Sequence, residues 1–304
     1  MRITQSMLSN NMLRHLMSSQ QKLDTYLEQL YTGRKINYPS DDPVVAMKGI
    51  AYRTEVSEVG QFKRNAGEVR TWMDNSDAAL DKATQTMHRL HELSIQASNS
   101  TYDKGELMSI KEEVVQLRDH LIDIANTKVS GKYIFNGKNT SEAPITVEDG
   151  EINININGDP VEIEVFKGSK IQANVSAKDL FGDNSENGFF GKINKFIEAL
   201  EEPSSEDFDE ENFAGFDESI ENLDQNLSAI LDSRAALGAR MNRLDLIENR
   251  LNEQEVIAKE MMANNENVHF EEAITDLITQ ETLHRAALAA GSRIIQPSLI
   301  DFLR

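Results

Sequence analysis

The chain has 304 residues, with 31 basic and 51 acidic side chains, so its formal net charge is −20. This sign is wrong for binding nucleic acid. The absence of cysteine excludes disulfides and thiolate metal sites. No apolar run approaches the roughly 18 residues of a membrane span, and the N-terminus lacks a secretory signal. We therefore expect a chain that is cytoplasmic, or exported without a cleaved signal, and has no membrane partner.

Proline is scarce and its distribution favours long helices. The chain has six prolines, and none lies in 44–143 or 204–296. Near the N-terminus, leucines recur at steps of three and four, the spacing of a helix that packs against another helix. The leucines with this spacing are Leu13, Leu16, Leu23, Leu27 and Leu30. The pattern predicts a first helix that ends near Gly33.

A second helix is predicted to begin at Pro43. Ser40, Asp41 and Asp42 can accept hydrogen bonds from the free N–H groups of a helix N-terminus, and proline suits the first turn. Apolar or small residues then continue at helical spacing to residue 97, which predicts a helix on the order of 80 Å long. After a polar loop, the spacing over 107–124 predicts a third helix, antiparallel to the second.

The hydrophobic period changes from 3.6 to 2 after residue 132. The sequences EINININ (151–157) and VEIEVF (161–166) alternate, with Gly158 and Asp159 between them as turn residues. This pattern predicts that the two segments form one β-hairpin. We place it in a small β-rich insert at the tip of the helices, because helices enter and leave it.

The C-terminal part returns to helical spacing over 216–264, and the last stretch, 270–304, is apolar. Both chain ends are therefore apolar helical stripes without a neighbouring partner in the sequence. We expect the first helix to pair with the last, and the second and third to pair with 216–264. The predicted fold is mainly α, an elongated antiparallel helical coiled-coil rod with the insert at its tip.

Three parts follow from this pattern. The terminal helices comprise 1–42 plus 265–304, the helical rod domain comprises 43–135 plus 189–264, and the small β-rich insert domain comprises 136–188.

Two residue groups could bind a metal, and both are better explained otherwise. His88, His91 and Glu92 could face one ion from a helix, but they flank a buried apolar stripe. Asp207, Asp209, Glu211 and Glu218 match positions of a calcium loop, which fails because Asn212 stands where glycine is needed. The sequence also lacks the common nucleotide-binding and hydrolase motifs. We assign no catalytic, cofactor or metal residue, and expect no enzyme.

Two runs in the sequence resemble the paired terminal motifs of the bacterial flagellin superfamily. They are QLYTGRKINYPSDDPVVA (29–46) and RAALGARMNRL (234–244). Pro39, Pro43 and the run GKYIFNG (131–137) look more like the hook-associated members of that superfamily than like filament flagellin. The residues that carry the resemblance are Gly33, Arg34, Asn37, Asp41, Asp42, Arg234, Leu237, Gly238, Arg243 and Leu244.

The resemblance implies a structural subunit at the junction between the hook side and the flagellin filament. It implies export by the flagellar type III apparatus without a cleaved signal, an extracellular location in the bacterial flagellum, and chain ends that become ordered on assembly. The implied partners are further copies of the chain in a helical ring, hook-associated protein 1, flagellin and a flagellar export chaperone. No cofactor is implied.

Assembly would bury apolar stripes that one chain cannot cover. We predict assembly contacts at Leu13, Leu16, Leu23, Leu27, Leu277, Ile278, Leu288, Ile295, Leu299 and Phe302. The alternative is that these residues form an ordinary helix pair within one chain. Three other functions stay open: a filament-forming flagellin, a cytoplasmic coiled-coil adaptor, and a metal-dependent helical enzyme built around His88, His91 and Glu92.

Overall fold

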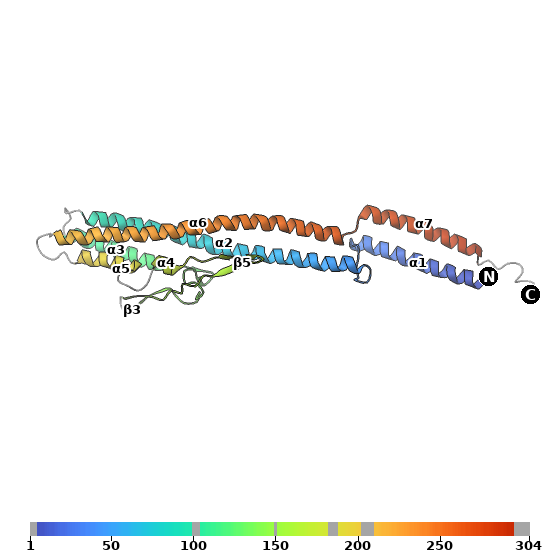
Figure 1. Ribbon diagram of the computed structural model, residues 1–304, viewed down its shortest axis with the longest axis horizontal. Helices are drawn as coiled ribbons and strands as arrows, with labels where there is room; N and C mark the ends of the chain where they lie inside the picture. Colours follow the sequence, from blue (N-terminus) through green and yellow to red (C-terminus); the bar gives the residue numbers. More distant parts are fainter. Residues whose placement is uncertain (1–4, 99–103, 149–150, 182–187, 202–209, 295–304) are drawn as a thin grey trace, which may run out of the picture. The chain divides into compact units, whose positions relative to one another are not determined.

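The computed structural model describes residues 5–98, 104–148, 151–181, 188–201 and 210–294. Helices dominate these residues (Figure 1). The helices are α1 (Gln5–Thr32), α2 (Pro43–Ala97), α3 (Lys104–Ala125), α4 (Ala177–Phe181), α5 (Phe189–Glu201), α6 (Glu210–Glu266) and α7 (Phe270–Ile294). The strands are β1 (Lys128–Val129), β2 (Lys132–Tyr133), β3 (Ile145–Glu148), β4 (Glu151–Ile154), β5 (Glu162–Phe166) and β6 (Ser169–Gln172). The predicted mainly α fold with small antiparallel β-structure is confirmed.

The chain packs as two compact units. Unit 1 comprises Met1–Glu58 and Gln254–Arg304, and unit 2 comprises Val59–Glu253. Helices α2 and α6 each contribute residues to both units. The residues predicted to form a separate insert, 136–188, lie within unit 2. The three-part division of the sequence stays a prediction.

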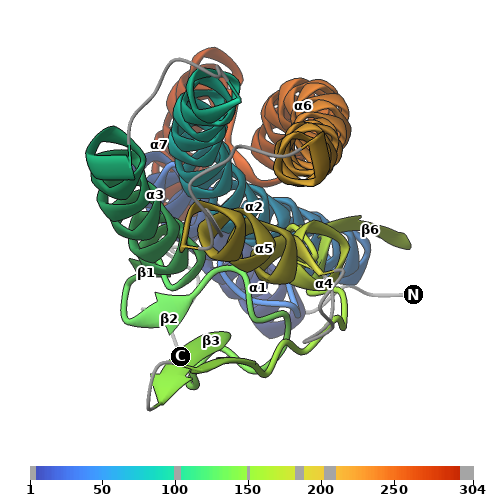
Figure 2. The same cartoon turned by 90° about the vertical axis from the view of Figure 1, so that its left-hand side faces the viewer.

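Four helices of unit 2 pack in a ring, in the order α2, α3, α5, α6 (Figure 2). The prediction that α3 pairs with α6 is wrong, because α5 lies between them. Helix α5 was not predicted, although its apolar residues recur at steps of three and four. A polar contact marks each border of the ring: Arg89 with Glu113, Arg118 with Asn194, Lys192 with Gln225, and Arg234 with Asp77.

The core of this ring is built on a seven-residue repeat. One residue of α6 in every seven is fully or almost fully buried, which keeps a single apolar stripe facing the other helices. These residues are Leu223, Ile230, Leu237, Leu244 and Leu251. Helix α2 carries a corresponding buried apolar stripe, which includes Met73, Leu80, Met87 and Leu90, all at most 1% exposed.

The predicted hairpin is wrong in its pairing, although both strands exist. Strand β4 pairs with β3, which precedes it, and β5 pairs with β6, which follows it. The link between β4 and β5 is held open by two buried asparagines: Asn157 N donates to Asn136 Oδ1 and Val161 N donates to Asn174 Oδ1, each at 2.8 Å. The tight turn is supplied instead by Gly168, whose φ of +76° favours glycine.

The position of the β-rich part also differs from the prediction. Helix α3 has 22 residues and returns along α2 for about 33 Å, so the strands begin well away from the ends of the helices. Strand β5 lies beside the middle of α2, where Asn65 Nδ2 donates to Glu164 O at 2.8 Å (Figure 1). The insert therefore packs along the side of the helices of unit 2 and not at their tip.

In unit 1, α1 and α7 form an antiparallel pair, as predicted for the first and last helices. The seam between them combines apolar side chains, such as Leu16, Leu23 and Leu277, with small and polar ones. Gln280 Nε2 donates to Ser19 Oγ at 3.0 Å, and His284 Nδ1 lies 3.2 Å from the same oxygen. Farther along, the side chain of Met12 fills the space above Gly291, where any β-carbon would collide with it.

Candidate assembly surface and motif turn

The turn between α1 and α2 contains the first family-like motif, and we call residues 33–42 the motif turn. Helix α1 ends because Gly33 adopts a φ of +69°, while its N–H donates to Gln29 O at 2.8 Å. This is the left-handed helix cap that glycine favours. The predicted end of the first helix is confirmed.

Two adjacent aspartates shape the rest of the motif turn. Asp42 Oδ1 accepts hydrogen bonds from Val44 N at 2.9 Å and Val45 N at 3.1 Å, which makes it the N-cap of α2. Asp41 Oδ2 accepts from the backbone N–H groups of Asn37 and Tyr38 at 3.2 and 2.9 Å. Local capping therefore accounts for the Asp-Asp pair, as the sequence indicated.

The motif turn is tied to the C-terminal end of α6. Lys35 N donates to Glu266 O at 2.7 Å, and Val268 N donates to Gly33 O at 3.0 Å. Arg34 and Asn267 form an isolated antiparallel β-bridge between the two connections. At this hydrogen-bonded point of unit 1 the chain leaves α1 and, in the other connection, passes from α6 into α7.

A bidentate ion pair between Arg53 and Glu266 also holds α2 to the C-terminal end of α6. Neither residue was predicted to have a role. Arg53 Nε lies 2.7 Å from Glu266 Oε1, and Arg53 Nη2 lies 2.6 Å from Glu266 Oε2. The hydrogen bonds to Glu266 raise the pKa of Arg53 above its ordinary value. Gly49 makes the approach possible, since a β-carbon there would lie 2.9 Å from Glu266 Oε1. Because Arg53 and Glu266 are 213 positions apart, no local sequence pattern indicates that they pair.

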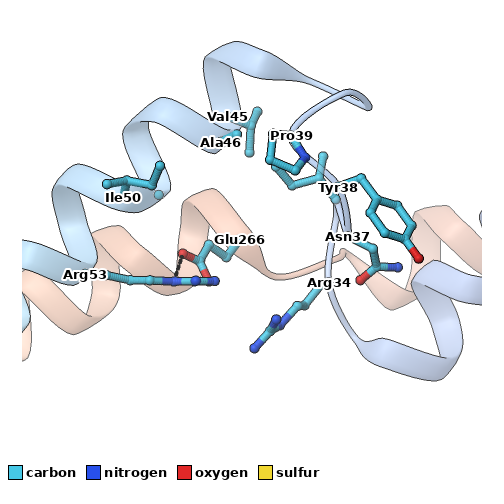
Figure 3. A pocket seen from close by; sticks show the side chains of 11 residues that line it. Arg34, Asn37, Tyr38, Pro39, Val45, Ala46, Ile50, Arg53 and Glu266 are labelled. Carbon is cyan, nitrogen blue, oxygen red and sulfur yellow. Dashed lines mark hydrogen bonds and ion pairs between the residues drawn. The ribbon is translucent and has the colours of Figure 1, made fainter.

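A pocket of about 150 Å³ opens beside the motif turn (Figure 3). Its apolar wall comes from Pro39 and from the first turns of α2, including Val45 and Ile50. Its polar side comes from Arg34 and from the Arg53–Glu266 pair. The pocket therefore offers an apolar wall and a cationic group to one side chain.

The second family-like motif lies on α6 in unit 2. Arg234 contacts Asp77 at 2.8 Å and Asp81 at 2.6 Å, and its hydrogen bond to Asp77 raises its pKa. Leu237 and Leu244 belong to the buried repeat. Arg243 reaches Ser169 Oγ at 3.4 Å. Gly238 has open space where a β-carbon would point, so nothing in the packing explains it.

One further arginine of this motif run holds the insert. Arg240 Nη1 donates to Asn174 O at 3.0 Å and lies 3.5 Å from Gln172 O. Burial lowers the pKa of its guanidinium, because loss of surrounding water disfavours the charged form. The sequence alone did not indicate a role for this residue.

The predicted assembly residues divide into two groups. Leu16, Leu23 and Leu277 are half-buried in the seam between α1 and α7, where the intramolecular alternative also places them. Leu13, Leu27, Ile278 and Leu288 have exposed fractions of 47%, 52%, 58% and 49%. Ile295, Leu299 and Phe302 lie outside the described residues. A role in assembly stays a prediction for all of them.

Met7, Leu8 and Leu283 aside, the exposed large apolar residues of α1 and α7 share one side of the helix pair. At about 100° per residue, they lie roughly a quarter turn from the centre of the seam on each helix. Because α1 and α7 are antiparallel, the same sense of rotation along each chain places both sets on the same side. We call this set the outer face; it comprises Leu13, Met17 and Leu27 on α1, with Ile274, Ile278 and Leu288 on α7.

Several residues of the metal hypotheses contact other side chains or lie outside the described residues. His91 Nε2 lies 3.2 Å from Asp224 Oδ1, and Glu92 pairs with Arg89 at 3.1 Å. Asp207 and Asp209 lie outside the described residues. Within the described part of the chain, no three histidine or acidic side chains come together as metal ligands.

No helix among the described residues has the length and apolar character to cross a membrane.

Comparison with known protein families matches both ends of the chain. Residues 3–140 match the bacterial flagellin N-terminal helical region, and residues 220–303 match the bacterial flagellin C-terminal helical region. The two matched regions contain the motif turn and the motif run of α6, respectively.

Individual relatives fall into two groups. The flagellar hook-associated protein 3 of Escherichia coli (strain K12) is 25% identical over 95% of this chain and 96% of its own length. Flagellin E of Vibrio cholerae is 31% identical over 41% of this chain and 33% of its own length.

Among solved structures, a putative flagellar hook-associated protein from Vibrio parahaemolyticus has a TM-score of 0.68 at 21% identity, covering 75% of this chain and all of that one. Flagellar hook-associated protein 3 from Legionella pneumophila has a TM-score of 0.64 at 16% identity, covering 70% and 98%. These structural likenesses concern the fold.

Proposed function

The chain belongs to the bacterial flagellin family, and on this premise we propose that it is the structural subunit joining the hook side of a flagellum to the flagellin filament. The observation that carries the proposal is the extent of the similarity. The match to hook-associated protein 3 runs through nearly all of both chains, whereas the match to flagellin E covers a third of that flagellin.

The helix pair of unit 1 supplies a physical basis for assembly. Its seam combines leucines with small and polar side chains, while its outer face exposes leucine, isoleucine and methionine side chains. Burial of apolar surface is worth about 25 cal/mol per Å², so neighbouring subunits that cover the outer face add to the stability that the seam gives the pair. Contacts between unlike surfaces of successive copies build an open helical array instead of a closed dimer.

The proposal extends to location and partners. As part of the flagellum, the chain acts outside the cell, and we propose that it leaves through the flagellar type III apparatus. Its neighbours would be further copies of itself, hook-associated protein 1 and flagellin, with an export chaperone before assembly. The role is structural and requires no catalysis.

Deletion of the gene tests the function. We expect cells that make hooks but no attached filaments and that release flagellin into the medium, with recovery when the gene is restored. A deletion strain with full-length filaments would contradict the junction role. Quantification of the protein in purified flagella separates the alternative, since a filament flagellin would be the major protein and a junction subunit a minor one.

A further inference from the structure

We propose that the pocket beside the motif turn receives Tyr31 from a neighbouring copy of the chain. This inference rests on the proposed self-assembly and deepens it, because it names one anchoring side chain and its receptor. Both belong to unit 1, so every copy carries one of each.

The size and the lining of the pocket fit an aromatic ring with a polar end. A cavity of about 150 Å³ accommodates a benzene-sized group. Pro39, Val45 and Ile50 offer apolar contact to the ring, and Glu266 can accept a hydrogen bond from a phenol at the polar side. A small aliphatic side chain would leave this polar side unused.

Arg34 is the cation that remains available at the pocket. Arg53, the other arginine there, is already held by Glu266. The Arg34 backbone takes part in the β-bridge to Asn267, but its guanidinium has no hydrogen bond or ion pair with any residue that the structure describes. A guanidinium group attracts the face of an aromatic ring, and Arg34 offers this group at the polar side of the pocket.

Tyr31 is the large hydrophobic side chain with the greatest exposed fraction among the described residues, 93%. It lies in the last turn of α1 and does not line the pocket of its own copy. Its direction from the helix continues the outer face beyond Leu27, so a neighbour that covers this face also reaches Tyr31. Tyrosine and arginine are the residue types that most often anchor interfaces.

The charge of the chain favours such an anchor. At −20, two copies repel each other through most of their polar surface. A neutral aromatic side chain that meets a free arginine adds no like-charge contact. Because the anchor and its pocket differ, the contact passes from copy to copy and suits an open array.

Photo-cross-linking of the full chain tests the inference. The photoreactive analogue azidophenylalanine replaces Tyr31, and equal amounts of ¹⁵N-labelled and unlabelled protein are assembled and irradiated. We expect links between labelled and unlabelled copies, joining position 31 to the peptide that contains residues 34–50. The analogue at Lys22, on the opposite side of α1, should not give these links.

Two pocket variants and a matched control sharpen the result. Ala46→Met fills the pocket and Arg34→Ala removes its cation; each should lower the yield of these links at least about tenfold, as the loss of an anchoring contact does. Ala51→Met makes the same exchange at an exposed position of α2 outside the pocket and should leave the yield unchanged. Tyr31→Phe should assemble at nearly the concentration of the parent chain, and Tyr31→Ala only at a higher one.

The outcomes separate this inference from the proposed function. Copies that assemble but link through Tyr31 to another region, or within one copy, overturn the Tyr31 contact and leave the junction role standing. Equal yields from Ala46→Met and Ala51→Met overturn it as well. Absence of any assembly, with or without partner subunits, would contradict both.

Discussion

The outer face of unit 1 gives the most direct test of the assembly mechanism. Replacing Leu13, Leu27, Ile278 and Leu288 by alanine removes apolar surface that one copy leaves about half exposed. Alanine keeps the helices intact, because it has the highest helix propensity. The change therefore acts on contacts between copies more than on the fold of one copy.

The magnitude follows from the exposed fractions. Full burial of a leucine or isoleucine is worth about 1.5–3 kcal/mol, so the half that remains exposed can contribute about 1 kcal/mol in an assembly. Allowing for incomplete coverage, four residues contribute about 3 kcal/mol per subunit. At 1.4 kcal/mol per factor of ten, the critical concentration for assembly should rise about a hundredfold.

Sedimentation of assembled protein over a concentration series measures this value. The control variant replaces Lys22 and Asp276, exposed polar residues on the opposite side of the same helices, by alanine. It should assemble as the parent chain does. An outer-face variant that assembles at the parent concentration would refute the reasoning, and assembly would then have to depend on surfaces elsewhere.

Three further predictions concern stability. Leu237→Ala empties a fully buried position and should cost about 3 kcal/mol, seen as a loss of 6–12 °C in melting temperature; Leu246→Ala, 71% exposed on the same helix, should change it by less than about 0.5 kcal/mol. Asp42→Ala removes the N-cap of α2 and should cost about 1 kcal/mol in urea unfolding, whereas Asp42→Asn should retain most of it; equal losses would reject the cap. Gly168→Ala should cost about 1 kcal/mol from backbone strain alone, since space is open there. Gly168→Asn should cost less, and the reverse order would contradict the strain argument.

Helix ends could be predicted because their causes lie within a few residues. Gly33 ends α1 and Asp42 begins α2 through contacts that each span four residues or fewer. The two family-like motifs could also be recognised in the sequence, because the motif turn and the run on α6 each occupy one short segment.

Strand pairing could not be predicted in the same way. The alternation of β4 and β5 indicated two strands but carried no information about partners, and the Gly-Asp pair between them suggested the wrong turn. Asn136 and Asn174, which hold that link open, bind it across 21 and 13 residues. Helix α5 was not predicted either, although the spacing of its apolar residues is typical of a helix.

The amino-acid sequence by itself determined which segments are helical, where the main helices start and stop, and that the chain ends carry apolar stripes, because capping and hydrophobic periodicity are local properties. Only the tertiary structure decided which leucines lie in the seam and which on the outer face, and it alone brought Arg53 to Glu266 and formed the pocket beside Arg34. Those relations depend on the rotation of one helix against another, and residues more than 200 positions apart meet only when the whole chain has folded.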